Sequence, residues 1–396
     1  MSRRFSPETT APTAKLTSGH AAADGGHAAA DTSVATVAGQ HRRDPEAKVQ
    51  HIEVCLHQDV EYRKTTGLEA FELINQALPE VSLEHIDLTG RLAGKAIGAP
   101  LMIAPMTGGT EQGHQINRQL ARAAQRWRLP MSVGSQRVAL EDPARAELFA
   151  IRAEAPDAVL FANFGGAQLV RGWGADEARR AVDMVRADAL FIHLNPIQEA
   201  IQGGDQDFRG LAAKLAALCS ALAVDGIPVF AREICFGLSP EAVRMLVDCG
   251  VAGIDCAGAG GTSWAKVEAL CAKTERRRVM GLRFGEWGIP TSRSILNVRA
   301  IAPAIPLIAT GGLRNGVDLA RALALGADVG AMARPFLLAA VKGEEVLDRF
   351  IEETLTELRI CMFGTGAGNV AALRGRIERT EASSAHPIGN NGVTAA

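Results

Sequence analysis

Eight short apolar segments recur along the chain, and longer stretches with helical periodicity separate them. Each segment is nearly continuous in apolar residues, as parallel strands are when both faces of their sheet are buried. Eight strand-and-helix units in succession predict an α/β fold of the (β/α)₈ or TIM barrel type, rather than an open doubly wound sheet. The predicted strands are residues 100–105, 130–134, 158–163, 189–195, 228–233, 252–257, 306–310 and 329–333. The clearest predicted helices are residues 115–126, 175–185, 208–222, 240–249 and 317–325.

The two ends of the chain carry few large apolar side chains. Residues 1–45 and 381–396 cannot bury enough surface to offset their chain entropy, so we expect both tails to be disordered. The histidines of the first tail, His20, His27 and His41, are too widely spaced to predict a metal site. Residues 46–98 have a weakly strand-like pattern. We interpret them as an N-terminal extension that covers one end of the barrel, which itself spans residues 99–380.

Composition limits the partners and the compartment. Hydrophobic residues make up 47% of the chain and charged residues 22%, which is ordinary for a globular protein with a large core. The formal net charge of −2 provides no basic field, so we expect no nucleic acid partner. No apolar run is long enough to span a membrane, so no membrane partner is expected. The seven cysteines show no disulfide framework, and a cytoplasmic location fits them best.

The residues that follow the predicted strands place polar chemistry on one rim of the barrel, where the active site of this fold lies. Gly311-Gly312 follows the seventh strand and Ala333-Arg334 ends the eighth. Barrel enzymes usually bind a phosphate group at these two positions through backbone N–H groups. A single glycine pair is a weak signal, because many turns need a positive φ. The two positions together predict a phosphate-bearing cofactor or substrate.

The fourth predicted strand carries an unusual density of polar side chains. His193 and Asn195 point to the same side of the strand, and Gln198 and Glu199 follow in the loop above it. Glu199 is a candidate ligand of Mg²⁺, because this ion commonly takes one carboxylate together with phosphate oxygens and water. From the residues alone, metal binding and a purely structural role are equally open.

Several motifs between residues 48 and 364 resemble, in combination and in order, the type 2 isopentenyl-diphosphate isomerases, a family of flavin-dependent enzymes. The motifs are MTGG, GSQR, ANFGGAQ, HLNPIQE, GAGGTSWA, WGIPT, TGGLRNGVD, LGAD and ARPFL. The resemblance implies that isopentenyl diphosphate is isomerised to dimethylallyl diphosphate by reduced FMN, which adds and removes a proton. It also implies NADPH as the reductant, bound Mg²⁺ and a homo-oligomer.

The resemblance assigns roles to individual residues. His193, Asn195 and Gln198 would be catalytic, and Glu199 would hold Mg²⁺ against the substrate phosphates. The residues assigned to the substrate diphosphate are Lys48, Ser135, Gln136, Arg137, His193, Asn195 and Gln198. The residues assigned to FMN are Met106, Thr107, Gly108, Ser135, Asn163, Arg232, Thr262, Gly311, Gly312, Leu313, Ala333 and Arg334.

Three positions depart from the family pattern and leave alternatives open. This chain has Ala47-Lys48 in place of an Arg-Lys pair, Arg232 in place of a lysine, and a shortened loop after Gln202. It could therefore have diverged to another prenyl diphosphate, or bind flavin and prenyl diphosphate without catalysis. A different FMN barrel enzyme, such as a 2-hydroxy-acid oxidase, would need a His–Arg pair after the sixth strand. Residues 258–264, GAGGTSW, supply neither.

Overall fold

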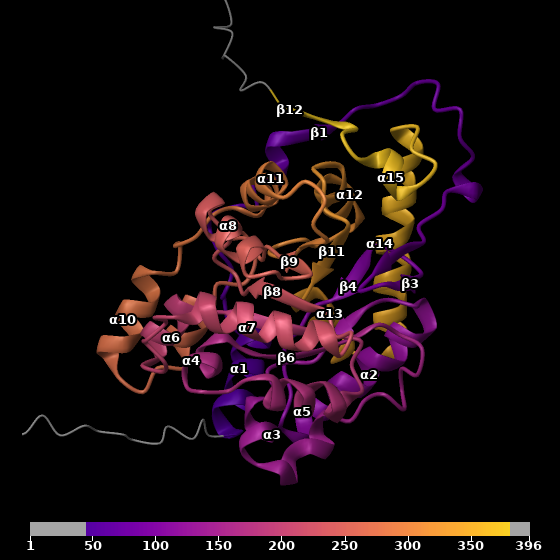
Figure 1. Cartoon of the computed structure of the whole chain (residues 1–396). Coiled ribbons are helices and arrows are strands. Elements are labelled where there is room, and N and C mark those ends of the chain that lie inside the picture. Colours follow the sequence, from indigo (N-terminus) through magenta and orange to yellow (C-terminus); the bar gives the residue numbers. More distant parts are fainter. Residues whose placement is uncertain (1–44, 381–396) are drawn as a thin grey trace, which may run out of the picture. The chain divides into compact units, whose positions relative to one another are not determined.

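The computed structural model describes residues 45–380, in which eight parallel strands close into a barrel (Figure 1). Consecutive strands are neighbours, and the eighth pairs again with the first. Seven predicted segments contain the observed strand, and the third strand lies two residues later than predicted. The predicted fold is therefore confirmed. The strands are β4 (Leu101–Ile103), β5 (Met131–Ser132), β6 (Leu160–Gly165), β7 (Ala189–Leu194), β8 (Val229–Glu233), β9 (Gly253–Asp255), β10 (Leu307–Ala309) and β11 (Val329–Met332).

Helices surround the barrel (Figure 1). All five predicted helices are present, with ends within four residues of those predicted. The 21-residue helix α14 (Glu344–Gly364) is not among the predicted helices. Outside the barrel, β1 (Phe71–Leu73) pairs with β12 (Ile377–Arg379). The helices are α1 (Pro45–His57), α2 (Glu111–Trp127), α3 (Arg137–Glu141), α4 (Gly166–Val170), α5 (Ala175–Val185), α6 (Pro196–Gln202), α7 (Leu211–Val224), α8 (Pro240–Asp248), α9 (Trp264–Leu270), α10 (Glu275–Arg283), α11 (Thr291–Ile301), α12 (Gly316–Ala324), α13 (Arg334–Ala340), α14 (Glu344–Gly364) and α15 (Val370–Leu373).

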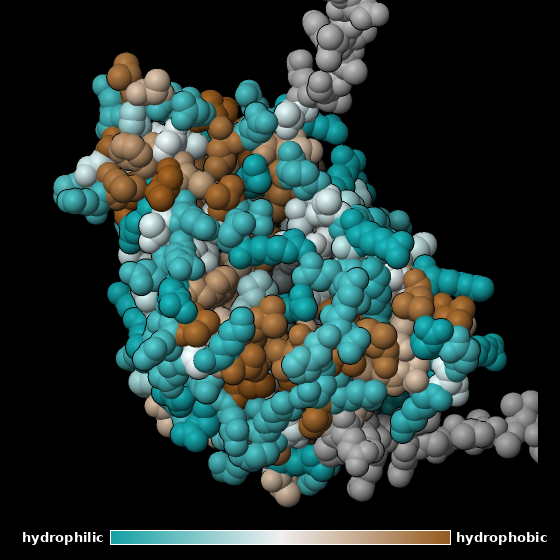
Figure 2. All heavy atoms as spheres, turned by 180° about the vertical axis from the view of Figure 1, so that it is seen from behind, coloured by the Kyte–Doolittle hydropathy of each residue, from teal (hydrophilic) through white to brown (hydrophobic). Residues whose placement is uncertain are grey.

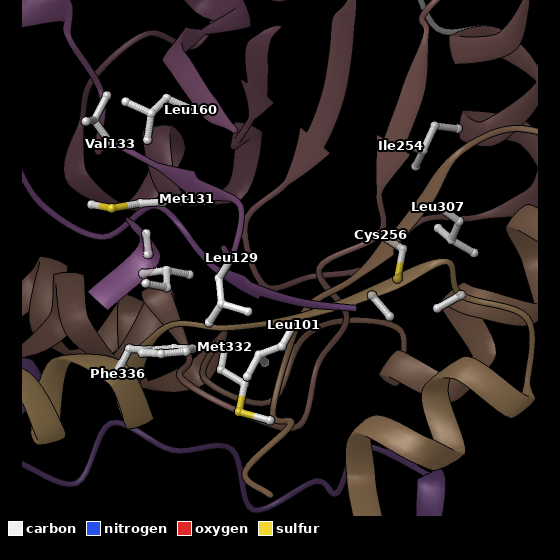
Figure 3. Close-up of a cluster of buried hydrophobic side chains, with 14 of the residues drawn as sticks. Leu101, Leu129, Met131, Val133, Leu160, Ile254, Cys256, Leu307, Met332 and Phe336 are labelled. Carbon is white, nitrogen blue, oxygen red and sulfur yellow. The ribbon is translucent and has the colours of Figure 1, made fainter. Parts of the chain in front are cut away.

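Strand residues alternate between two hydrophobic layers of the core. Met102 and Phe161 belong to the inner layer, which fills the barrel. Their sequence neighbours Leu101 and Leu160 belong to the outer layer, between the strands and the helices. Figure 3 shows part of this outer layer, in which Phe336 of α13 lies with residues of the strands. Burial of both faces explains why the strands read as nearly continuous apolar runs.

The N-terminal extension, which we expected to cover one end of the barrel, contributes to both ends. It begins with α1 (Pro45–His57), and residues of this helix line a cavity at the carboxyl ends of the strands. The antiparallel strands β2 (Gly90–Leu92) and β3 (Lys95–Ile97) lie at the amino ends, where Leu92 and Ile97 pack into the inner core layer. Single short elements carry too weak a pattern to show which end of a barrel each one covers.

An arginine clamp joins β6 to β7 at their amino ends. Arg152 donates from Nη1 to the carbonyl of Ala158 at 2.8 Å and pairs through Nη2 with Asp188 at 3.0 Å. The same Asp188 carboxylate accepts the backbone N–H of Leu160, the first residue of β6, at 2.8 Å. One ion pair therefore fixes the loop before β6 and the register of β6 against β7.

A second clamp of the same construction joins β10 to β11, half a barrel away. Arg299 pairs through Nη2 with Asp328 at 2.7 Å and donates from Nη1 to the carbonyl of Ile305 at 2.6 Å. Asp328 accepts the backbone N–H of Leu307, the first residue of β10, at 2.8 Å. In both clamps the arginine precedes the strand by eight positions, Arg152 before Leu160 and Arg299 before Leu307. The same arrangement of an arginine, an aspartate and backbone groups thus joins two neighbouring strands in each half of the barrel.

The exposed surface is mostly polar with scattered apolar groups. Figure 2 shows a face on which hydrophilic side chains predominate and hydrophobic ones gather in separate patches. Exposed apolar side chains in residues 45–380 include Leu78, Val224 and Trp287. Throughout the same residues, no helix combines the length and the hydropathy needed to cross a membrane.

Candidate functional site

A cavity of about 440 Å³ lies at the carboxyl ends of the strands, and ligand sites for small molecules typically measure ~300–1,000 Å³. Each of the eight strands, or the loop directly after it, contributes to the wall, and α1 contributes from the extension. All twelve residues that the resemblance assigns to FMN line this cavity. Of the residues assigned to the substrate, four line it as well: Lys48, Ser135, His193 and Gln198.

Glycines let the loops after β9 and β10 pack backbone against backbone beside the cavity. The φ angles of Gly311 and Gly312 are +107° and +81°, a region that favours glycine. A side chain at Gly311 would overlap the carbonyl oxygen of Gly258, and one at Gly312 would overlap that of Gly260. Both positions therefore require glycine, for a conformational and for a steric reason. Backbone without side chains at a cavity wall suits the close approach of a phosphate group.

Two arginines flank these loops and share one carboxylate. Arg334 donates to one oxygen of Glu61 at 2.8 Å, and Arg314 donates to the other at 2.8 Å. Burial alone would raise the pKa of Glu61, but hydrogen bonds and charges from both arginines hold it below its usual value. Glu61 also lies opposite Thr262 in an antiparallel bridge. The extension thus fixes the Thr262 loop and brings a carboxylate that no sequence pattern indicated.

Arg232 lies on the cavity wall in a buried ion pair. It is directly opposite Asp255 in the pairing of β8 with β9, and its Nη1 donates to Asp255 Oδ2. The Thr310 hydroxyl donates to the same oxygen at 2.9 Å. Burial raises the pKa of Asp255, and the charge of Arg232 opposes that rise. An acidic residue inside an apolar strand was the sequence signal that could have revealed this partner.

Hydrogen bonds fix the orientation of His193 at the end of β7. Its Nδ1 lies 2.9 Å from Asn163 Oδ1. Because Asn163 Nδ2 donates to the carbonyl of Val133 at 3.1 Å, its Oδ1 is the acceptor and His193 Nδ1 carries the hydrogen. In the neutral ring, Nε2 is then the acceptor. The residue predicted from the HLNPIQE motif therefore reaches the cavity in a defined tautomer.

The side-chain amide of Gln198 is held from both ends. Its Oε1 accepts from Asn195 Nδ2 at 3.0 Å, and its Nε2 donates to Glu268 Oε1 at 2.7 Å. Glu268 lies on α9, and its Oε1 is also 3.5 Å from His51 Nε2 on α1. The amide cannot rotate without losing a hydrogen bond, so Gln198 has a fixed orientation at the cavity. Sequence reasoning missed Glu268, although a charged residue between apolar helix positions was a signal for it.

Glu199 is buried beside an amide oxygen that has no partner. Its Oε1 accepts from Asn195 Nδ2 at 2.9 Å, and its Oε2 accepts the backbone N–H of Asp205 at 2.9 Å. Within the described residues, Asn195 Oδ1 is buried and has no hydrogen-bond partner. A Cβ at Gly204 would overlap Glu199 Oε2, which explains a glycine in the shortened loop. A carboxylate next to an unsatisfied amide oxygen suits a hard cation.

Lys48 brings a positive charge from α1 to the wall of the cavity. Its Nζ donates to the carbonyls of Gly108 at 2.8 Å and Ser135 at 3.2 Å, which follow β4 and β5. Ala47 lines the cavity as well. An arginine at this position would have faced the same wall, so α1 supplies one member of the expected Arg-Lys pair.

Three residues assigned to the substrate do not line the cavity: Asn195, whose amide holds Gln198 and Glu199, and Gln136 and Arg137. Gln136 is buried, and its amide joins the carbonyl of Ala181 at 2.8 Å to the backbone N–H of Asn163 at 2.8 Å. Arg137 donates from Nε to Glu141 at 2.8 Å. Both residues are described, and neither lines the cavity. The backbone turns into α3 directly after Ser135, which directs Gln136 toward α5, so its position fits a structural role.

The chain matches known proteins over most of its length. Residues 41–156 and 221–379 match the FMN-dependent dehydrogenase family. An isopentenyl-diphosphate delta-isomerase of Synechococcus sp. is 50% identical over 332 residues, which cover 83% of this chain and 94% of that protein. One of Nostoc sp. is 49% identical over 338 residues, which cover 84% of this chain and 96% of that protein.

Solved structures show the same barrel at low sequence identity. A lactate oxidase of Pediococcus acidilactici aligns with a TM-score of 0.56 at 18% identity, over 85% of this chain and 91% of that one. A mandelate oxidase mutant aligns with a TM-score of 0.55 at 17% identity, over 83% and 91%. These two likenesses concern the fold alone. The family match and the high identity to the isomerases show that this chain belongs to the FMN-dependent dehydrogenase family and to the isopentenyl-diphosphate delta-isomerases.

Proposed function

We propose that this protein isomerises isopentenyl diphosphate to dimethylallyl diphosphate with bound, reduced FMN. The observation that carries the proposal is one cavity with two sets of polar residues on its wall. The first set is the phosphate cradle of Gly311, Gly312 and Arg334, after β10 and β11. The second set is His193 and Gln198, at the end of β7 and after it. The two sets offer separate donors for two phosphate-bearing ligands. When bound, reduced FMN supplies the acid–base chemistry that moves a proton between two substrate carbons.

The FMN phosphate is assigned to Gly311, Gly312 and Arg334. Backbone N–H groups and a guanidinium fork are the donors that suit phosphate oxygens. The other residues assigned to FMN lie around the same cavity, and the buried Arg232 places a cation in its wall. Apolar groups such as Met106 and Leu313 exclude water from the same space.

The substrate diphosphate is assigned to Lys48, Ser135, His193 and Gln198. Lys48 contributes a charge beside the ends of β4 and β5. Gln198 and His193 are fixed by hydrogen bonds, so they can orient a bound headgroup without losing much conformational entropy. Asn195 acts through its neighbours, because its amide holds both Gln198 and Glu199.

Mg²⁺ is assigned to Glu199 with the adjacent amide oxygen of Asn195. Residues 45–380 contain no group of three or more His, Cys, Asp or Glu side chains that could hold a metal. A cation at Glu199 would therefore take further ligands from substrate phosphates and water, as Mg²⁺ commonly does.

The other readings have less support. Residues 258–264, after β9, contain neither histidine nor arginine, so the His–Arg pair of a 2-hydroxy-acid oxidase has no counterpart there. Ala47 and the short loop at Gly203-Gly204 favour either a diverged prenyl diphosphate substrate or binding without catalysis. The identity of 49–50% to isopentenyl-diphosphate delta-isomerases over more than four-fifths of this chain favours the isomerase over both.

Anaerobic turnover tests the proposal. Protein loaded with FMN and Mg²⁺ and reduced with NADPH should convert isopentenyl diphosphate to dimethylallyl diphosphate, measured by mass spectrometry of the hydrolysed products. The same sample without reductant should be inactive. Bound FMN with turnover only of a longer prenyl diphosphate would support divergence, and bound FMN without any turnover would support the non-catalytic reading.

Glu199→Gln tests the proposed metal site. Loss of the carboxylate charge should lower Mg²⁺-dependent turnover by at least about tenfold, as changes at metal-ligand shells typically do, while the protein keeps its bound FMN and yellow colour. Glu241→Gln, on the exposed surface of α8, is the matched control and should turn over normally. Unchanged turnover in Glu199→Gln would refute the metal role.

A homo-oligomer is part of the same proposal. Met280 and Leu282 of α10 and Trp287 after it are exposed apolar side chains close together in sequence, and clustered apolar surface is typical of subunit contacts. Light scattering on a sizing column should give a mass above that of one chain. A Trp287→Glu variant should shift that mass downward, and an unchanged mass would argue against this surface as the contact.

A further inference from the structure

The cations of the cavity wall differ in how they are neutralised. Arg314 and Arg334 share Glu61 at the side of the phosphate cradle. Lys48 contacts backbone carbonyls from α1. Arg232 is 5% exposed and lies on a barrel strand, paired with a fully buried carboxylate. The charge that a ligand in the cavity experiences from Arg232 therefore depends on that carboxylate.

The carboxylate of Asp255 is firmly held. Its Oδ2 accepts from Arg232 Nη1 and, at 2.9 Å, from the Thr310 hydroxyl, and its Oδ1 accepts the backbone N–H of Ala257 at 3.2 Å. The pairing of β8 with β9 sets Arg232 and Asp255 directly opposite each other. Opposite charges in contact largely cancel at a distance, because the field of a close pair falls off faster than that of one ion.

We propose that Asp255 is a positioning residue that fixes Arg232 and cancels most of its charge, so that a near-neutral pair sets the reduction potential of bound FMN. This inference rests on the proposed FMN site. A lone buried cation would stabilise the reduced, anionic flavin strongly and raise its potential. The pair does so weakly, and it also keeps the guanidinium from turning away from the cavity.

Asp255→Asn tests the cancellation. The variant removes the negative charge and keeps the size of the side chain, so Arg232 should act as an unmasked cation. The midpoint potential of bound FMN, measured by anaerobic titration against reference dyes, should rise. A tenfold gain in affinity for reduced over oxidised FMN corresponds to about 30 mV for a two-electron couple, and we expect a rise of at least this size.

The double variant Arg232→Met/Asp255→Asn tests whether Arg232 influences FMN as part of a near-neutral pair or as a lone cation. It replaces a near-neutral pair with two neutral groups, so its potential should return close to that of the wild type. If Arg232 acted as a lone cation, the double variant would instead show the low potential that follows from its loss. Thr310→Val removes a hydrogen bond from the same carboxylate without changing charge, and its potential should move far less than that of Asp255→Asn.

The outcomes distinguish this inference from the proposed FMN site. An unchanged or lowered potential in Asp255→Asn, with FMN still bound, would overturn the inference alone. A double variant with a potential well below that of the wild type would overturn it as well. Failure of the wild type to bind FMN would overturn the proposed site together with the inference. Asp87→Asn, on the surface, controls for a general loss of negative charge and should leave the potential unchanged.

Discussion

Single residues around the cavity are constrained by backbone geometry. Gly311 combines a positive φ with a close approach to Gly258, whereas Gly343 has a φ of +114° and open space around the position of a Cβ. Gly343→Ala should therefore cost about 1–3 kcal/mol of unfolding free energy from backbone strain alone. Gly311→Ala should cost more, because strain and overlap add, and should also lose FMN. Urea unfolding and flavin absorbance measure both effects, and equal losses of stability would contradict the steric argument.

A buried carboxyl gives a second prediction at the residue scale. Burial raises the pKa of Glu233 to about 8, from an ordinary value of 4.5. Between these values the native state holds a proton that the unfolded chain has released, so the free energy of unfolding should fall as pH rises from about 4.5 to about 8.

The variant Glu233→Gln removes this titration. Its stability should change less with pH over the same window, as measured by urea unfolding at several pH values. Glu241→Gln, an exposed substitution, should keep the slope of the wild type. Parallel pH profiles for wild type and Glu233→Gln would contradict the raised pKa.

At the scale of elements, the two arginine clamps hold neighbouring strands at corresponding positions of the two barrel halves. The side chain of Asp188 is 8% exposed and that of Asp328 is 35% exposed. Arg152→Met leaves the buried Asp188 carboxylate with Lys95 as its cationic partner but removes the charged hydrogen bonds that fix the loop before β6, so it should cost roughly 1.5–3 kcal/mol. Arg299→Met should cost less, because water reaches Asp328.

The clamps lie at separate sites, so their effects should be additive. The double variant Arg152→Met/Arg299→Met should lose the sum of the two single losses, since distant substitutions without shared partners usually combine independently. Arg209→Met breaks only an exposed pair with Asp207 and should leave the unfolding midpoint unchanged. A double loss well below the sum would indicate that the two barrel halves are coupled.

At the scale of the whole molecule, a ligand in the cavity would join all eight strands and α1. Removal of FMN should therefore lower global stability rather than loosen one loop. A ligand at one hundred times its Kd stabilises a folded protein by about 2.7 kcal/mol. The Tm of FMN-free protein should rise by several degrees on addition of FMN, measured by calorimetry, and riboflavin, which lacks the phosphate, should have a smaller effect. Equal effects of both ligands would argue against the phosphate cradle.

Much of the fold follows from local pattern. Continuous apolar runs and helical periodicity predicted all eight barrel strands, because burial of both sheet faces leaves the same trace in every parallel strand. The position of Gly311 and Arg334 after the last two strands predicts a phosphate site, and both residues line the cavity. The extension was the exception, since α1, β2 and β3 are placed by contacts with residues far away in the chain.

The sequence by itself determined the barrel, the rim that carries the chemistry, and through its motifs the family. Tertiary structure alone decided which partner each buried polar side chain has. Gln136 bonds to α5, Asp255 holds Arg232, and Glu268 holds Gln198. The physical reason is that the positions of strands along the chain follow from local apolar pattern, whereas the partner of a charge depends on which side chains meet across a closed barrel. Such meetings join residues of different strands and helices, so a local pattern can mark a buried charge such as Asp255 or Glu268 but cannot name its partner.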